Sequence, residues 1–305
     1  MPLISIILPT YNVEKYIARA LESCINQTLK DIEIIVVDDK GQDRSIDIAY
    51  EYASRDYRIR IIHNEENLKL LHARAEGVKV ATSELIMFLD PDDELEPNAC
   101  EIVYNNFDKN CEVLRFGYNL IGFDDSFKLN HPKDYDDFIK RIKKLEYFDF
   151  LMWDMAIKKQ KYLECFKYIQ EYDLTNINIA EDVVFNFILN AICGCYKKIT
   201  FTLYKYYKNN TSMTNIKTLN SLEVSIKTKQ EIIVFFNYLF CKYPNIFKKD
   251  LYYSHDFFIK KVIMEEKLLV QNMNTSLVNK LINKIKYKLE IKRLRYLQKK
   301  YLNKG

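Results

Sequence analysis

Phe88-Leu89-Asp90-Pro91-Asp92-Asp93 decides the fold, because an apolar run from Leu85 to Leu89 ends there in three carboxylates within four residues. A strand that is buried on both faces reads as a short, unbroken apolar run. Open α/β sheets bind ligands just beyond the carboxyl ends of their strands. Hard divalent cations such as Mg2+ and Mn2+ take carboxylate oxygens and often complete their shell with substrate phosphates. The stretch therefore predicts a buried strand that carries an Asp-x-Asp metal site for a diphosphate.

The first part of the chain alternates short β-rich runs with segments of helical spacing. Apolar residues recur every three or four positions in those segments, which indicates helices over 17–24, 46–53, 71–81 and from Pro97 to Phe107. In the second of these helices the expected apolar face consists of Ile46, Ala49, Tyr50 and Ala53. Asn12 is the expected N-cap of the first helix. The β-rich runs are Ile4–Leu8, Ile32–Val37, Ile59–Ile62 and Leu85–Leu89. This βαβ alternation predicts an α/β fold with a doubly wound, mostly parallel sheet.

The pattern weakens between residues 110 and 150, where the chain is acidic and aromatic and contains His131. A solvated loop is favoured there over a second metal site, since no regular ligand spacing is visible. Strong helical spacing returns after Glu181-Asp182, with an apolar stripe at Phe185, Ile188, Leu189 and Ile192. Two acids are thus expected at the start of a helix.

The C-terminal end is helical in pattern and strongly basic. Leu281, Ile285, Leu289 and Leu297 fall roughly on one stripe, and Glu290 is the lone acid among ten basic residues: Lys280, Lys284, Lys286, Lys288, Lys292, Arg293, Arg295, Lys299, Lys300 and Lys304. Such a basic amphipathic helix is typical of anionic membrane surfaces. A merely solvated face is the alternative. We expect three parts: 1–110 with the diphosphate site, 111–215 with Glu181-Asp182, and a helical region at 216–305.

Composition excludes several classes of protein. The chain has 305 residues, of which 48% are hydrophobic and 14% aromatic, with only 6 Gly and 6 Pro, a composition typical of a packed globule. Its net charge of +4 is too small to indicate nucleic-acid binding. Its seven cysteines are odd in number and scattered, so we expect reduced thiols, and Cys193-Gly194-Cys195 lacks the partners of a zinc site. Neither a signal peptide nor an apolar run of membrane-spanning length is visible. A cytoplasmic location is expected.

Acids also follow the second strand, at Asp38-Asp39, so two strands deliver carboxylates to one crevice. The chain has neither Gly-x-Gly-x-x-Gly nor a P-loop to cradle phosphates, so a diphosphate in this crevice needs a cation. We expect Asp92 to bind the metal and Asp90 to support it through the metal or a ribose hydroxyl. Asp39 would accept hydrogen bonds from a base or ribose. Helix capping is favoured for Asp93, and loop solvation for Asp38.

Four motifs together resemble a known family. They are Ser5-Ile6-Ile7-Leu8-Pro9-Thr10-Tyr11-Asn12-Val13-Glu14, the stretch from Gln27 to Asp39, Ala73-Arg74-Ala75-Glu76-Gly77 and Phe88-Leu89-Asp90-Pro91-Asp92-Asp93. These motifs closely resemble the inverting family 2 glycosyltransferases with a GT-A fold. Within that family the chain is most similar to bacterial lipooligosaccharide galactosyltransferases that add β-1,3-linked galactose. The likeness is strongest over the first 100 residues.

The resemblance implies roles for individual residues. It places Pro9, Tyr11 and Glu14 around the nucleobase and ribose, Asp39 on the base and Arg74 near the nucleotide. Asp90 and Asp92 become the metal site, and Asp182 the general base that takes the acceptor proton. N-capping is the alternative role for Asp182, and Trp153 either offers a ring face to the acceptor sugar or lies in the core.

The chain also departs from the family pattern. A small residue usually stands at Lys40, glycine often near Lys69, lysine commonly near Met155, and a metal-binding histidine often within 207–212. These departures bear on donor choice and turnover.

The expected function is therefore metal-dependent hexosyl transfer. With Mn2+ or Mg2+, a hexose, galactose by resemblance, moves from a UDP-sugar to a hydroxyl of a lipooligosaccharide-type or other cell-surface glycan, with the enzyme peripheral on the inner face of the cytoplasmic membrane. Two alternatives stay open: a polyprenyl-phosphate hexosyl synthase, and an inactive sugar-nucleotide-binding scaffold docked at the membrane. No nucleic-acid partner is expected, and the oligomeric state is not predicted.

Overall fold

The structure is a computed structural model that describes residues 1–123, 137, 140–141, 151–174, 177, 179–209, 218–272 and 277–302. The chain divides into two compact units. The first unit contains residues 1–135 and 149–209, and the second contains residues 136–148 and 210–305. The expected acidic loop with His131 lies outside the described residues.

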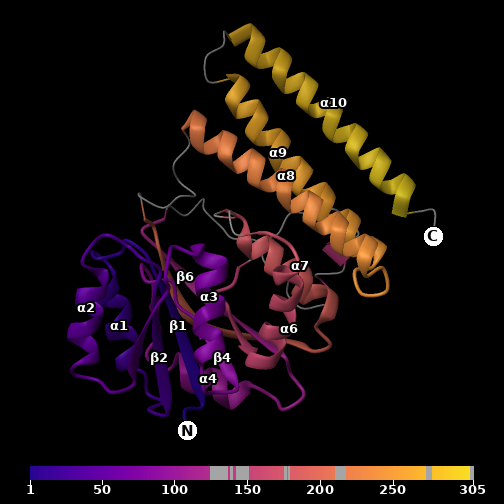
Figure 1. The fold of residues 1–305 in the computed structure, drawn as a ribbon. Coiled ribbons are helices and arrows are strands. Elements are labelled where there is room, and N and C mark those ends of the chain that lie inside the picture. The colour runs from indigo at the N-terminus through magenta and orange to yellow at the C-terminus, as the bar shows by residue number, and fades with distance from the viewer. Residues whose placement is uncertain are drawn as a thin grey trace. The chain divides into compact units, whose positions relative to one another are not determined.

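A mixed sheet forms the centre of the first unit (Figure 1). It has eight strands in the order β3-β2-β1-β4-β7-β6-β8-β5. The four expected strands are present and pair in parallel, with Ile4 of β1 opposite both Ile32 of β2 and Leu85 of β4. Their bounds are β1 Ile4–Thr10, β2 Ile32–Asp38, β3 Ile59–His63 and β4 Leu85–Phe88. Every residue of β1 and β4 is buried, as the unbroken apolar runs predicted.

The other half of the sheet was not predicted. It consists of β5 Glu94–Leu95, β6 Val113–Ile121, β7 Met155–Lys158 and β8 Tyr196–Tyr207, with β7 antiparallel to both β4 and β6. The loop expected over 110–150 was wrong for β6. Arg115 interrupts the apolar run of that strand, and its charge is buried only because Asp154, far along the chain, pairs with it.

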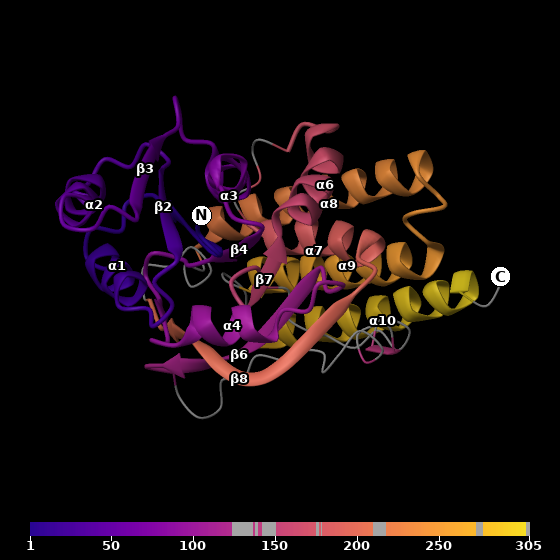
Figure 2. The ribbon, with the colours of Figure 1, turned by 90° about the horizontal axis from the view of Figure 1, so that it is seen from below.

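Helices cover both faces of this sheet. On one face, α1 Ile17–Ile25, α2 Ser45–Ala53 and α4 Ala99–Asn106 share a core with the side chains of Ile6 and Ile34. On the other face, α3 Lys69–Val80 packs on β1 and β2, with α6 Lys159–Gln170 and α7 Glu181–Ile192 beside it. Figure 2 shows α1 and α2 on one side of β2 and α3 on the other. The predicted α/β class is confirmed.

Two local predictions on this face were wrong. Asn12 does not cap α1, whose N-cap position is Tyr16. Asn12 instead adopts a left-handed φ of 53°, and its Oδ1 accepts a 2.7 Å hydrogen bond from the backbone N–H of Gln42. Tyr50 was expected on the apolar face of α2, but its side chain is 51% exposed. Its hydroxyl bonds His63 Nε2 at 2.8 Å, so a polar partner holds it at the surface.

The second unit contains three long helices, α8 Leu219–Lys242, α9 Lys249–Asn272 and α10 Leu277–Leu302. The middle helix, α9, contacts both α8 and α10 (Figure 1). Thr218 and Ser221 form a capping box at the start of α8, and Lys229 of α8 pairs with Glu266 of α9 at 2.9 Å. Within the described ranges, no helix combines the length and the apolarity needed to cross a bilayer.

Gly77 allows α3 to approach the sheet closely. A Cβ atom at this position would overlap Cγ2 of Ile7 and would lie 3.0 Å from Cγ2 of Val37. Both side chains belong to buried strands, so neither has free space into which to move. The glycine of the third motif is therefore a packing requirement.

We expect Gly77→Ala to lower the free energy of unfolding by up to about 2 kcal/mol. Overpacking costs ~1–3 kcal/mol, and the better helix propensity of alanine returns ~1 kcal/mol. Urea denaturation measures the change. Gly194→Ala is the matched control, because a Cβ there meets only Glu112 Oε2 at 3.5 Å. Equal stability of the two variants would contradict this account of Gly77.

Candidate active site

A buried guanidinium joins the two acidic motifs. Arg74, on α3, is 2% exposed and binds Oδ1 of Asp90 at 2.9 Å and Oδ1 of Asp182 at 3.0 Å. Its Nη1 atom also lies 3.5 Å from Oε1 of Glu181. The Asp-x-Asp after β4 and the acids at the start of α7 therefore meet at one point, although about ninety residues separate them in sequence.

Electrostatics set the protonation of this cluster. Burial opposes the charge on Arg74, but Asp90, Asp182 and Glu181 outweigh it and raise the pKa of the guanidinium, so Arg74 stays charged. Burial also raises the pKa of the Asp182 carboxyl well above its ordinary value, helped by repulsion from Glu181 and Asp90 and opposed by Arg74. The Asp182 side chain remains 19% exposed. It is thus a partly accessible carboxylate with a stronger affinity for protons than an aspartate in water.

Asn209 supports Asp92, the expected metal ligand. Its Nδ2 donates a 3.0 Å hydrogen bond to Asp92 Oδ2, and its Oδ1 accepts a hydrogen bond from the hydroxyl of Tyr16 at 3.3 Å. Burial, with a further contribution from Asp90, raises the pKa of Asp92. Arg19, on α1, donates to the main-chain oxygen of Asp92 and so anchors the loop that carries it.

Asp93 does not cap a helix, and that expectation was wrong. Its side chain is fully buried and accepts hydrogen bonds from the Tyr204 hydroxyl at 2.8 Å and from the Tyr207 backbone N–H at 2.7 Å. Burial and repulsion from Asp92 and Asp90 raise its pKa to about 9, so it holds a proton at neutral pH. Asp93 ties the acidic loop to β8.

The donor set suits a divalent cation. Asp90, Asp92, Glu181 and Asp182 bring more negative charge to the cluster than Arg74 offsets. Among the described residues, no group of three or more metal-binding side chains is present. Asp90 and Asp92 would supply two hard oxygen donors to such an ion. Mg2+ and Mn2+ commonly bind through one or two carboxylates and complete their shell with phosphate oxygens and water. The residues therefore fit such an ion.

Asp39 mainly holds the start of α3. It is 3% exposed, and its oxygens accept hydrogen bonds from Asn64 Nδ2 at 2.8 Å, Leu68 N at 2.8 Å and Lys69 N at 3.0 Å. A carboxylate has about four acceptor positions. One position therefore remains for the expected contact with a base.

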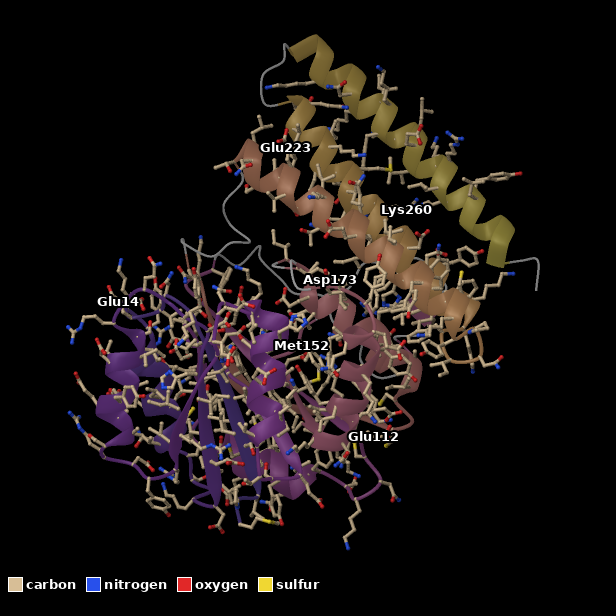
Figure 3. All side chains as sticks on the ribbon, viewed as in Figure 1. Glu14, Glu112, Met152, Asp173, Glu223 and Lys260 are labelled. Carbon is tan, nitrogen blue, oxygen red and sulfur yellow. The ribbon has the colours of Figure 1, made fainter. Side chains whose placement is uncertain are left out.

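The three other residues expected near the nucleotide lie on β1 and the loop that follows it. Pro9 is buried within β1, whereas Tyr11 is 47% exposed and Glu14 is exposed. Figure 3 labels Glu14 at the end of the first unit where β1 and β2 finish. Its Oε2 accepts a 3.0 Å hydrogen bond from the backbone N–H of Arg44, which joins the β1 and β2 loops. Tyr11 thus gives this loop an exposed aromatic ring.

Four non-glycine residues with positive φ border the site. They are Asn12, Lys40, Lys69 and Ala180, with φ between 53° and 66°. They lie after β1, after β2, at the start of α3 and just before α7. Two of these positions, Lys40 and Lys69, are departures from the family pattern, and the left-handed backbone explains why a small residue or glycine suits them.

Trp153 lies in the core and does not offer a ring face to an acceptor. It is 4% exposed and sits between Tyr204 and Tyr206, with ring centroids 4.5 Å and 5.1 Å away. Tyr206 is half-buried and stacks in turn on Phe123 at 5.5 Å. Met155 is fully buried in β7, where a lysine would need a partner.

A second buried network supports Asp182, and sequence reasoning missed it. Asn186 donates from Nδ2 to the backbone oxygen of Asp182 at 2.8 Å and accepts a hydrogen bond from Arg115. Arg115, on β6, also binds Asp154 and the backbone oxygen of Leu151. The available signal was a charged residue inside the apolar run 113–116, because a buried arginine requires acceptors.

We expect Lys69→Gly to raise the free energy of unfolding by about 0.5–1 kcal/mol. A left-handed side-chain residue costs ~1–2 kcal/mol, from which the extra entropy of glycine in the unfolded chain subtracts ~0.5–1 kcal/mol. Thermal or urea unfolding measures it. The control Lys167→Gly, in the right-handed helix α6, should instead destabilise the protein. Destabilisation by both substitutions would refute the strain at Lys69.

Arg74→Met should destabilise the protein by about 3–5 kcal/mol, because it leaves buried acids without their counter-charge. Adding Asp182→Asn should recover part of that loss. A double-mutant cycle in urea measures the coupling, with the exposed Arg55→Met as control. Strictly additive losses would show that the two side chains do not interact.

Comparisons with known proteins identify the family of the chain. Residues 5–166 match the family described as Glycosyl transferase family 2. The uncharacterized glycosyltransferase EpsJ of Bacillus subtilis (strain 168) is 33% identical over 251 residues, which cover 78% of this chain and 71% of EpsJ.

Two solved structures share the fold. S. aureus TarS 1-349 in complex with UDP-GlcNAc has a TM-score of 0.59 at 17% identity and covers 96% of this chain and 92% of its own. Mannosyltransferase PcManGT from Pyrobaculum calidifontis, in complex with GDP-Man and Mn2+, has a TM-score of 0.54 at 16% identity and covers 99% and 84%. From the family match and the relative together, the chain belongs to the family 2 glycosyltransferases.

Proposed function

We propose that this glycosyltransferase is metal-dependent and inverting, and that it moves galactose from UDP-galactose to a hydroxyl of a lipooligosaccharide or other cell-surface glycan in a β-1,3 linkage. The observation that carries the proposal is the contact of Arg74 with both Asp90 and Asp182. Arg74 thus holds the proposed metal-binding carboxylate and the proposed proton acceptor close to each other, so that one ligand could reach both. Direct displacement at an anomeric carbon needs this pair of groups.

In the proposed reaction, Asp182 takes the proton of the acceptor hydroxyl while the hydroxyl oxygen attacks the anomeric carbon. The bond from that carbon to the diphosphate oxygen breaks, and UDP leaves with the bonding electron pair. Attack from the opposite face turns an α-linked donor into a β-linked product. When bound, a divalent cation would neutralise charge on the departing diphosphate. The raised pKa of Asp182 makes it a better base near neutral pH than an ordinary aspartate.

On the donor side, the β1 and β2 loops supply Tyr11 and the remaining acceptor position of Asp39 for the nucleotide. Arg74 Nε is a buried donor without a hydrogen-bond partner among the described residues, which suits an oxygen of an anionic ligand. The complexes of TarS with UDP-GlcNAc and of PcManGT with GDP-Man and Mn2+ support a sugar nucleotide and a metal in this fold. Galactose rests on the motif resemblance.

On the acceptor side, we infer a glycan assembled at the inner face of the cytoplasmic membrane, with the enzyme peripheral there. The basic helix α10 supports this location.

We expect Asp92→Asn and Asp182→Asn to fail at different steps. Asp92→Asn should weaken Mn2+-dependent UDP binding, measured by calorimetry, because one hard oxygen ligand is lost. Asp182→Asn should keep UDP binding and lower the transfer rate by about 100- to 10,000-fold, the usual contribution of a general base. Release of UDP from UDP-galactose with a galactose-accepting oligosaccharide measures the rate.

Asp47→Asn, an exposed residue of α2, is the matched control. If both site variants bind and turn over like the parent, the site assignment is wrong. UDP binding without transfer by the parent, for any donor and acceptor, would favour a sugar-nucleotide-binding scaffold. Transfer to polyprenyl phosphate and not to oligosaccharides would identify the lipid-phosphate synthase.

A further inference from the structure

One face of helix α10 packs against α9. The hydroxyl of Tyr287 donates a 2.7 Å hydrogen bond to Glu265 of α9, and Asn283 Nδ2 lies 3.1 Å from Oδ1 of Asn272. Ile291, two turns after Asn283, is 8% exposed. Residues 283, 287 and 291 are spaced by four, so they form a single stripe that packs inward.

A second apolar stripe lies on the outside of the same helix. Ile285 is 52% exposed, Leu289 61% and Tyr296 68%. They are separated by four and seven residues, which places them on one side of a helix of 3.6 residues per turn. This corrects the expected stripe, since Leu297 is half-buried and the side chain of Leu281 lies outside those described. The outer stripe, Ile285, Leu289 and Tyr296, is unexplained by folding.

Exposed cations surround the outer stripe. Lys288 and Lys292 precede and follow Leu289 on the helix, and Arg293 and Arg295 flank Tyr296; all four are exposed. Glu290 is the single acidic residue within Leu277–Leu302, and its partner Arg293 lies 3.9 Å away at the surface. Apolar side chains with lysine and arginine on both sides match an anionic lipid interface. There the apolar side chains enter the boundary of the acyl region, and the cations bind the lipid head groups.

We propose that the outer stripe of α10 docks the enzyme on an anionic lipid bilayer. Charge complementarity selects this occupant. A second copy of the chain would bring a like-charged surface against this one, and three side chains bury far less than the ~800 Å² per partner of a stable dimer. Phosphate groups of a nucleic acid would satisfy the cations but would leave Ile285 and Leu289 in water.

The test is co-sedimentation of the full chain with vesicles of phosphatidylcholine alone or with one third phosphatidylglycerol. We expect binding to the anionic vesicles, weakened by salt because part of the attraction is electrostatic. Ile285→Gln combined with Leu289→Gln should lower the partition coefficient about tenfold or more, since apolar area no longer enters the lipid. Val234→Gln in α8 is the matched control: it is also an aliphatic side chain, 54% exposed, and should bind like the parent.

Three results would overturn the proposal. They are an absence of binding to anionic vesicles at low salt, binding by the double variant equal to that of the parent, and a dimer of the parent, detected by light scattering, that the double variant loses. Circular dichroism checks that α10 remains helical in the variants. Sedimentation does not depend on turnover, so a failure here would leave the proposed sugar transfer standing, and an inactive enzyme would leave lipid docking testable.

Discussion

The candidate active site depends on one buried guanidinium, that of Arg74, and the packing of α3 decides where this guanidinium lies. Asp39 holds the first backbone N–H groups of α3, and Gly77 lets the helix descend onto β1 and β2. Arg74 stands between these two anchors and meets acids from β4 and α7. A helix that lay further from the sheet would leave those carboxylates unpaired. The packing of α3 on the sheet therefore also fixes the position of Arg74 among the acids.

This arrangement concentrates negative charge inside the protein. The acids around Arg74 are buried close to one another, and the protein moderates their repulsion by keeping a proton on Asp93 and a hydrogen bond on Asp92. A cation and a diphosphate bound together would bring charges of opposite sign to the acids, whereas either one alone would bring charge of one sign. The left-handed residues Lys69 and Ala180 show that the loops also hold backbone strain next to the acids. Strain of this kind persists where the surrounding contacts over-determine the backbone.

The two units contribute different physics. The first holds the sheet, the acids and the buried arginines, and its function rests on short-range geometry. The second consists largely of helices, and ion pairs such as Lys229 with Glu266 join neighbouring helices. The outer surface of α10 is basic and apolar. The proposed recognition of a sugar nucleotide needs fixed atoms, whereas the proposed docking on lipid needs only apolar area and charge.

The amino-acid sequence by itself determined the four parallel strands, the helices between them, the acids at the strand ends and the start of α7, because each of these is encoded by neighbouring residues through burial period and local turn chemistry. The pairing of β6, β7 and β8, the burial of Trp153 between two tyrosines, the bond from Asp93 to Tyr204 and the Arg115–Asn186 support of Asp182 were decided only in the tertiary structure. These contacts join residues far apart in the chain, and nothing in a local pattern says which distant group will satisfy a buried charge or cover a ring. The same holds for α10, where only packing on α9 distinguishes the inner stripe from the outer one.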